Sequence, residues 1–285
     1  MEHAINVKGL TKNYPNFSIN NINLVVPKGY IVGLIGENGA GKSTTIKSIL
    51  NLINKDSGSI EVFGLDHSKY ELEIKQRIGI VFDESHFPDQ LKAKDINTMM
   101  KNIYQNWDTP LFNQYLKQFK LPENQIIKEF SRGMKMKLSL ATALAHHPKL
   151  LILDEPTSGL DPIVRNEILD IFLDFIQDEE HSILISSHIT SDLEKIADYI
   201  TFIHEGNIIF SESKDALLND YVIIKCREQE LTQIDPIDII HSKKTGQRYE
   251  LLVKDKQKME IKYRNLIMDQ PSIEDLMLIY IGGMK

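Results

Sequence analysis

The chain has 285 residues, of which 42% are hydrophobic and 26% charged, which excludes disordered, collagen-like and coiled-coil classes. The net charge of −7 argues against nucleic acid as a partner, because binding to phosphate backbones depends on an excess of Lys and Arg. The single cysteine, Cys226, cannot close an internal disulfide, which suits a reducing compartment. No apolar run approaches the roughly 18 to 20 residues that span a bilayer.

The N-terminal part is expected to be β structure. Residues 4–10 and 19–26 are apolar or alternating runs on either side of the turn-rich segment 13–16, which predicts antiparallel strands. Residues 31–35 form a short apolar run, and residues 43–53 after it have helical spacing. This order predicts a strand, a glycine-rich loop and a helix.

The glycine-rich loop matches the phosphate-binding motif G-x-x-x-x-G-K-[ST] in the strand–loop–helix context that the motif requires. Glycines let backbone N–H groups turn toward phosphate oxygens, and the helix N-terminus adds partial positive charge. We expect Lys42 to reach the β- and γ-phosphates, Ser43 to ligate Mg²⁺, and Thr44 to lie on the α-phosphate side. The predicted nucleotide-binding residues are Gly36, Glu37, Asn38, Gly39, Ala40, Gly41, Lys42, Ser43 and Thr44.

The middle of the chain is expected to be a helical insert, at about residues 84–147. It follows a short apolar run at residues 78–82, and its apolar side chains recur at spacings of three and four. Strand patterns return at residues 150–153, 182–186 and 199–203, with helices expected at 162–177 and 190–197. Alternation of strands and helices predicts a largely parallel sheet.

The strand at residues 150–153 ends in two adjacent carboxylates, Asp154 and Glu155. Behind a phosphate loop, such a pair suits a metal-side acid and a water-positioning base. We therefore expect Asp154 on the Mg²⁺ side and Glu155 as the catalytic general base. A solvated turn at the end of the strand is the alternative.

The character of the sequence changes at about residue 221. Strands are expected at residues 221–226, 248–253 and 259–263, followed by an apolar terminal helix after Pro271. The predicted fold is thus an α/β P-loop ATPase core with a mixed, largely parallel sheet, an N-terminal antiparallel β part, a helical insert and a small α+β accessory domain. The predicted boundaries are 1–220 for the ATPase domain and 221–285 for the accessory domain.

Further motifs narrow the class of ATPase. The run at residues 130–135 (Phe-Ser-Arg-Gly-Met-Lys) resembles the signature of ABC transporter ATPases, and residues 154–161 (Asp-Glu-Pro-Thr-Ser-Gly-Leu-Asp) resemble that family's acidic strand and D-loop. His188 after two serines resembles the switch histidine, and Tyr14 lies where the family stacks an aromatic ring on adenine. The resemblance covers about residues 4–212.

This resemblance implies that ATP is sandwiched between two such subunits, identical or homologous. The phosphate loop of one subunit would face Ser131, Gly133 and Met134 of the other, and His188 would bind the γ-phosphate as a further catalytic residue beside Glu155 and Lys42. Phe17 competes with Tyr14 for the adenine face. A transmembrane permease is the implied partner, which would hold the protein at the cytoplasmic face of the cell membrane.

The sequence departs from the family pattern at two places. Asp83 stands where the family usually has Gln, and it either ligates Mg²⁺ or belongs to a solvated loop. Phe130, Arg132 and Met134 replace the usual Leu, Gly and Gln of the signature. The altered signature resembles the branch that serves bacterial drug, antibiotic and lantibiotic exporters. The loop 83–91, with Phe87, is a candidate surface for the permease or an apolar plug.

The sequence therefore predicts the ATP-hydrolysing subunit of a membrane transporter, in the exporter branch, with ATP and Mg²⁺ as cofactors. A soluble ATP-switched clamp that acts on a non-transport partner is the alternative. A P-loop kinase or GTPase would leave the element at residues 131–134 unexplained.

Overall fold

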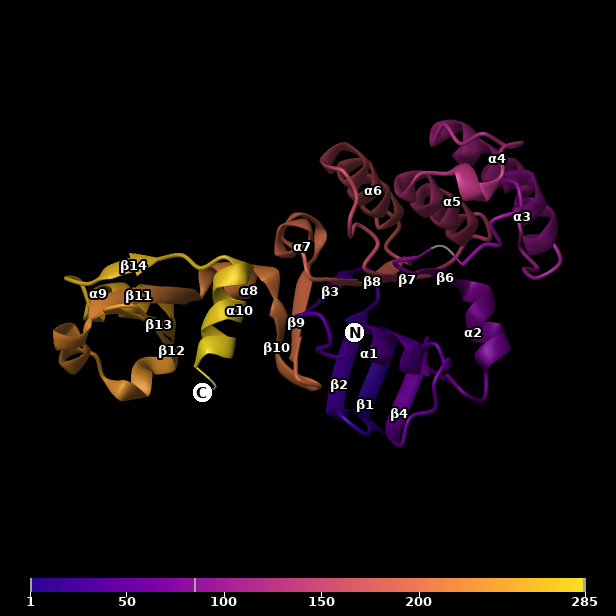
Figure 1. The fold of residues 1–285 in the computed structure, drawn as a ribbon. Coiled ribbons are helices and arrows are strands. Elements are labelled where there is room, and N and C mark those ends of the chain that lie inside the picture. The colour runs from indigo at the N-terminus through magenta and orange to yellow at the C-terminus, as the bar shows by residue number, and fades with distance from the viewer. Residues whose placement is uncertain (1, 85, 284–285) are drawn as a thin grey trace.

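The computed structural model describes residues 2–84 and 86–283. Within these residues the strands form three sheets (Figure 1). The first sheet is antiparallel, with strand order β2-β1-β4-β5. Its strands are β1 (His3–Tyr14), β2 (Phe17–Pro27), β4 (Ser57–Val62) and β5 (Leu65–Asp66). The expected N-terminal antiparallel part is confirmed, and its first two strands are longer than predicted.

The second sheet is the centre of the molecule, with strand order β10-β9-β3-β8-β7-β6. All neighbours are parallel except the edge strand β10, which is antiparallel to β9. Every residue of β3, β7 and β8 is buried, as expected for parallel strands covered on both faces. The strands are β3 (Ile31–Ile35), β6 (Ile78–Val81), β7 (Leu150–Asp154), β8 (Ser182–Ser187), β9 (Tyr199–His204) and β10 (Asn207–Ser213).

Helices connect the parallel strands and build the predicted insert. The insert lies on the right-hand side of Figure 1, in magenta, above the N-terminal β part. None of the described helices is both long and apolar enough to cross a bilayer. The helices outside the third sheet are α1 (Lys42–Ile49), α2 (Glu71–Arg77), α3 (Ala93–Met100), α4 (Thr109–Gln118), α5 (Arg132–Leu144), α6 (Pro162–Phe175), α7 (Thr190–Ile196) and α8 (Lys214–Asn219), with a 3₁₀ turn at Ile127–Glu129.

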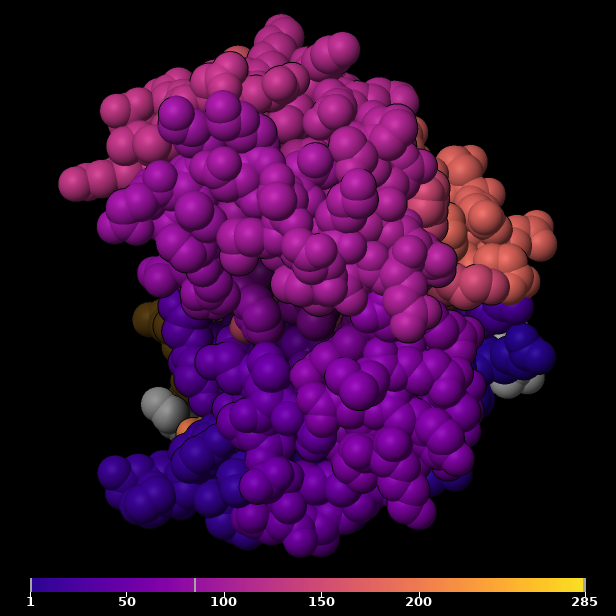
Figure 2. Space-filling model, turned by 90° about the vertical axis from the view of Figure 1, so that its right-hand side faces the viewer, coloured from indigo at the N-terminus to yellow at the C-terminus, as the bar shows by residue number. Residues whose placement is uncertain are grey.

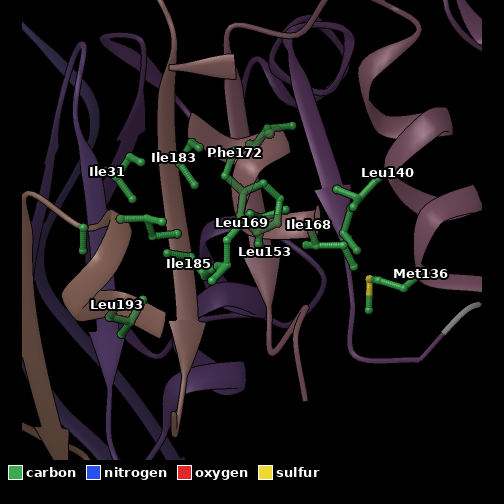
Figure 3. Packing of buried hydrophobic residues seen from close by; sticks show 14 of the residues in the cluster. Ile31, Met136, Leu140, Leu153, Ile168, Leu169, Phe172, Ile183, Ile185 and Leu193 are labelled. Carbon is green, nitrogen blue, oxygen red and sulfur yellow. The ribbon is translucent and has the colours of Figure 1, made fainter. Parts of the chain in front are cut away.

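The two faces of the central sheet have separate apolar cores. One core joins the antiparallel sheet and α1 to the central sheet, and includes Val32, Leu34 and Ile46. The other joins the central sheet to α5, α6, α7 and α10 (Ile273–Gly282). Figure 3 shows part of this second core, where Phe172 and Leu169 lie among Ile183, Ile185 and Leu153.

The third sheet, β12-β13-β11-β14, contains the residues expected in the accessory domain and is called the accessory sheet below. It consists of β11 (Tyr221–Arg227), β12 (Ile239–Thr245), β13 (Arg248–Lys254) and β14 (Ile267–Asp269). Alternate residues of β11 face two cores: Ile223 packs with α10 in the second core, whereas Ile224 packs in a third, smaller core. Two short 3₁₀ turns, Glu228–Gln233 and Pro236–Asp238, connect β11 to β12.

One predicted strand of this region is wrong. Residues 259–263 lie in and just after α9 (Lys256–Lys262), because the Asp255 side chain accepts a hydrogen bond from Lys258 N–H and starts a helix. Met259 and Tyr263 are buried in the third core. Their spacing of four residues fits one face of a helix, but in so short a segment it also fits alternate residues of a strand. The terminal helix after Pro271 is confirmed by α10.

His146 ends the helical insert in a buried position. Its Nε2 lies 3.0 Å from the carbonyl oxygen of Ile78, and its ring stacks on Tyr104 with centroids 3.9 Å apart. Burial lowers the pKa of His146 below its usual value. This histidine therefore joins the insert to β6 as a neutral ring.

Candidate nucleotide-binding site

The phosphate loop connects β3 to α1 at the carboxyl edge of the central sheet. Gly39 and Gly41 have φ values of 85° and 116°, which side-chain-bearing residues rarely adopt. Gly36 is needed for space instead: a Cβ there would lie 2.3 Å from the carbonyl oxygen of Ile203. Gly41 is the N-cap of α1 and makes no side-chain cap, so the first N–H groups of the helix stay available to an anion.

Lys42 is the first residue of α1, and its side chain is 5% exposed. Its Nζ donates to the carbonyl oxygens of Gly36 at 2.7 Å and Glu37 at 3.2 Å. It also lies 3.1 Å from Glu155 Oε1, as an ion pair rather than an aligned hydrogen bond. The structure thus brings together the predicted lysine and the predicted general base.

Glu155 follows β7 with a φ of 52°, a left-handed conformation that is uncommon for a residue with a side chain. Its N–H donates to both the carbonyl oxygen of Ser186 at 3.2 Å and the Ser186 hydroxyl at 3.1 Å. Its Oε2 lies 2.6 Å from His188 Nδ1 and accepts from the His188 N–H at 3.3 Å. Contacts therefore run continuously from Lys42 through Glu155 to His188.

Asp154 is the last residue of β7 and is 3% exposed. The Ser186 hydroxyl donates to Asp154 Oδ1 at 2.6 Å while it accepts from Glu155 N–H. Parallel register sets Asp154 beside Ser186, and Ser187 beside Ile35 at the start of the phosphate loop. The Ser186 hydroxyl thus helps to position both Asp154 and Glu155. The sequence pattern did not predict this role.

Ser43 and Thr44 lie in the first turn of α1 and are half-buried. Among residues 2–84 and 86–283, no three His, Cys, Asp or Glu side chains gather as ligands for a metal ion. The Ser43 hydroxyl and the Asp154 carboxylate are hard oxygen donors of the kind that Mg²⁺ prefers.

The signature segment lies on α5. Ser131 is the N-cap of this helix, and its Oγ accepts from Met134 N–H at 3.2 Å. Within the described chain, no hydrogen bond or ion pair joins residues 131–134 to the phosphate loop. Gly133 packs near Val164 of α6, where an added Cβ would meet that side chain at 3.1 Å.

Residues from the two segments that depart from the family pattern line one cavity. Asp83 and Glu84 share a cavity of about 320 Å³ with Arg132, Lys135 and hydrophobic residues of the signature region. The Arg132 guanidinium lies against Gly159, where an added Cβ would be 2.7 Å from Nη1. Lys135 already pairs with Asp89 at 3.1 Å. Asp83 therefore shares a cavity with acidic Glu84 and with basic residues of the signature region.

A second cavity, of about 490 Å³, adjoins the phosphate loop. Its lining includes Phe17, Asn38 and His204. Tyr14 is 42% exposed and does not line it, and Lys12 Nζ lies 5.6 Å from the centre of the Tyr14 ring. Phe17 Cζ would lie 3.1 Å from a Cβ added at Gly41. Phe17 therefore lies beside the phosphate loop and lines the adjoining cavity.

Comparisons with known proteins show which family the chain resembles. The family model described as "ABC transporter" matches residues 19–158. The lantibiotic transport ATP-binding protein SrtF of Streptococcus pyogenes is 39% identical over 233 residues, which cover 78% of this chain and 99% of SrtF. The bacitracin transport ATP-binding protein BcrA of Bacillus licheniformis is 38% identical over 215 residues, covering 73% of this chain and 69% of BcrA.

Solved structures share the fold. An ATP-binding subunit of an ABC transporter has a TM-score of 0.67 and 26% identity, over 75% of this chain and 91% of that one. A dimeric ATP-binding cassette in a post-hydrolysis state with ADP and Pi has a TM-score of 0.65 and 21% identity, over 73% of this chain and 98% of that one. The second likeness concerns the fold alone.

Proposed function

The chain belongs to the ABC transporter family as an ATP-binding and ATP-hydrolysing subunit, and we propose that it drives export of an antibiotic of the lantibiotic or bacitracin kind through a separate permease. The names of SrtF and BcrA support this substrate class. The observation that carries the chemistry is the chain of contacts from Lys42 through Glu155 to His188.

The proposed reaction is in-line attack of water on the γ-phosphate of ATP. Lys42 neutralises charge on the phosphates, Glu155 orients the water, and His188 binds the γ-phosphate. Phosphate oxygens would compete with Glu155 Oε1 for Lys42 Nζ, now 3.1 Å away. Nucleotide binding would thereby free a carboxylate oxygen for the water, so that one contact links binding to activation.

Mg²⁺ fits the proposed site because the available ligands are a hydroxyl and carboxylates. Ser43 and Asp154 would hold it, and the ion would supply charge neutralisation at the phosphates. Ser186 fixes Asp154 Oδ1 through the 2.6 Å hydrogen bond, which holds the carboxylate in place. Asp83 is proposed as a further ligand on the side of the signature cavity.

A second subunit is proposed to complete the site. Ser131 Oγ, Gly133 N–H and the N-terminal turn of α5 carry the donors that would face the partner's γ-phosphate, together with Met134. Their location on α5, without a bond to their own phosphate loop, supports a contribution across the dimer. The adenine would stack on Tyr14, or on Phe17, which lines the second cavity.

The permease is proposed to dock on the face where the helical insert meets the N-terminal β part, the face turned to the viewer in Figure 2. Leu72 of α2 is 82% exposed and Ile103 after α3 is 55% exposed, and the two segments are joined by a 3.0 Å hydrogen bond from Gln76 Nε2 to the Ile103 carbonyl. Phe87 of loop 83–91 is proposed to contact the permease as well. Docking there would place the protein at the cytoplasmic face of the membrane.

The first test uses tagged full-length Glu155→Gln, purified from native membranes in Mg-ATP and mild detergent. Turnover is expected to fall at least about 100-fold, since a positioned base contributes roughly 10²- to 10⁴-fold. ATP should stay bound, and mass spectrometry should identify a polytopic membrane protein as a stoichiometric companion. Lys42→Ala is the matched control and should retain no nucleotide.

Two results would contradict the proposal at different points. Near-normal turnover of Glu155→Gln would remove Glu155 from its role as base. Companions that are only soluble or ribosomal would support a soluble ATP-switched clamp, while the nucleotide chemistry would stand. A second, different cassette protein in the complex would show that the dimer is heteromeric.

A further inference from the structure

The C-terminal helix α10 is tied to a helix of the nucleotide-binding core. The N–H of Ile273, the first residue of α10, donates to Glu194 Oε1 of α7 at 2.8 Å. Ile273, Leu276 and Ile279 are buried in the core shared with Leu193 of α7. Figure 1 shows α10 between the accessory sheet and the β9–β10 edge of the central sheet. The accessory sheet and α7 therefore meet through α10.

α7 begins directly after the predicted γ-phosphate switch. β8 ends at Ser187, His188 follows, and Ile189 is the N-cap of α7. The Ile189 N–H donates to the Ser187 hydroxyl at 2.9 Å, which fixes the turn around His188. His188 Nδ1 is 2.6 Å from Glu155. A displacement of α7 must move this turn, because only Ile189 separates His188 from the helix.

Other contacts hold α7 firmly against its neighbours, so that it can move only as a unit. Lys195 Nζ donates to Asn166 Oδ1 of α6 at 3.0 Å, and Lys214 Nζ donates to the Glu194 carbonyl oxygen at 2.9 Å. Leu193 packs so closely on β3 that a Cβ added at Gly33 would lie 2.9 Å from it. Packed helices shift as units rather than deform, so force on Glu194 is carried along the helix.

The Glu194 contact is separate from the local cap of α10. Ser272 is the N-cap, and its hydroxyl accepts from Asp275 N–H at 3.1 Å while Asp275 Oδ2 accepts from Ser272 N–H at 3.0 Å. These bonds satisfy α10 from within its own segment. Glu194 instead binds the N–H of Ile273 from a different part of the chain, and its negative charge suits the helix N-terminus.

We propose that Glu194 is a positioning residue through which α10 and the accessory sheet set the placement of His188 against Glu155. Movement of the accessory sheet, for example on binding of a partner, would then change the rate of hydrolysis without a contact to the nucleotide. The inference rests on the roles proposed above for His188 and Glu155.

The test compares variants of the full-length chain that remove this hydrogen bond from either side. Glu194→Ala removes the acceptor, and Ile273→Pro removes the donor, since proline has no N–H yet is favoured at the first position of a helix. Ile273→Ala is the matched control for the proline, because both lose the buried side chain and only the proline loses the N–H. Ser272→Ala is the control for a weakened α10 with the Glu194 contact kept.

Glu194→Ala and Ile273→Pro are each expected to lower kcat roughly threefold to tenfold, with KM for Mg-ATP within about twofold. Amide hydrogen exchange of residues 186–190 should become faster in both. The double variant should be no slower than the worse single variant, because both remove one bond. Ile273→Ala and Ser272→Ala should stay within about twofold of the wild-type kcat.

The proposal is overturned if Glu194→Ala loosens α10 while kcat and exchange at residues 186–190 stay at wild-type values, because Glu194 would then only cap a helix. If Glu194→Ala does not fold, equal kcat values for Ile273→Pro and Ile273→Ala overturn it as well. If the wild-type chain hydrolysed no ATP, the proposed function would fail, whereas hydrogen exchange at residues 186–190 would still decide whether α10 acts on the switch.

Discussion

The central sheet and the accessory sheet use the same kinds of residue in opposite ways. In the central sheet, β3, β7 and β8 are wholly buried, and the Lys42–Glu155 ion pair beside them has side chains only 5% and 13% exposed. In the accessory sheet, residues of β12 alternate between half-buried and exposed, and the Lys225–Asp269 pair has side chains 38% and 48% exposed. The interaction between two charges is stronger where water is excluded, because the local dielectric constant is lower. The proposed chemistry therefore depends on the first region, and the second should tolerate substitution more readily.

The largest expected contrast comes from adding one methyl group to a glycine in each region. Gly36→Ala would place Cβ 2.3 Å from a backbone oxygen, whereas nothing lies within 4 Å of a Cβ at Gly246, whose φ is +63°. We expect Gly36→Ala to lower the free energy of unfolding by about 2–3 kcal/mol and to abolish ATP binding. Gly246→Ala should cost about 1 kcal/mol and leave binding intact. Urea unfolding and calorimetry would measure both, and equal losses would refute the contrast.

A smaller effect is expected along one strand of the central sheet. Ser186→Ala removes the hydroxyl that bridges Asp154 and Glu155. Hydrogen bonds to charged groups contribute about 1.5–3 kcal/mol, so kcat should fall roughly 10- to 100-fold. Ser182, at the other end of β8, bonds the Gly29 N–H instead. Ser182→Ala should therefore lower stability but not kcat, and a fall in kcat for both variants would show that Ser186 acts only through folding.

The next contrast concerns pH. Burial lowers the pKa of His146 in the helical insert and of His241 in the accessory sheet. The unfolded chain then binds protons that the folded chain does not, so stability is full above about pH 6.5 and falls as the pH drops below it. His146→Gln should reduce this loss more than His241→Gln, because His146 is 1% exposed and His241 only half-buried. Urea midpoints at pH 7 and 5 would test the order.

The smallest expected effect is at the surface of the accessory sheet. Lys225→Met removes the exposed ion pair with Asp269. Because exposed ion pairs contribute about 0.2–1 kcal/mol to the free energy of unfolding, we expect a loss of that size. Neither kcat nor the affinity for ATP should change. A loss of more than about 2 kcal/mol in urea unfolding would indicate that this region is as demanding as the central sheet.

The sequence predicted the phosphate loop and its strands well because their pattern is local. The run at residues 31–35 coincides with β3, and the expected strands at 150–153 and 182–186 differ from β7 and β8 by one residue. Short, wholly apolar runs next to glycine leave few alternatives. The mixed, largely parallel α/β fold is confirmed by the topology and by the structural relatives.

The rest depended on contacts between distant segments. The role of Ser186 arises from the register of β8 beside β7, and the approach of Phe17 to Gly41 arises from packing of the antiparallel sheet. In the accessory sheet, alternating residues at 259–263 predicted a strand, but the cap at Asp255 started a helix. β12 and β14 were also missed, because half-exposed edge strands carry a weak apolar pattern.

The position of β3 at the centre of its sheet has a consequence for the order in which the protein is made. Its neighbours on either side are β8 and β9, which are translated only after the whole helical insert. Ribosomes add about 5–20 residues per second, so the phosphate loop waits many seconds before its supporting strands exist. The β1–β2 hairpin can pair at once. A nascent chain released before β8 would carry the complete phosphate-binding motif and still be unable to hold ATP.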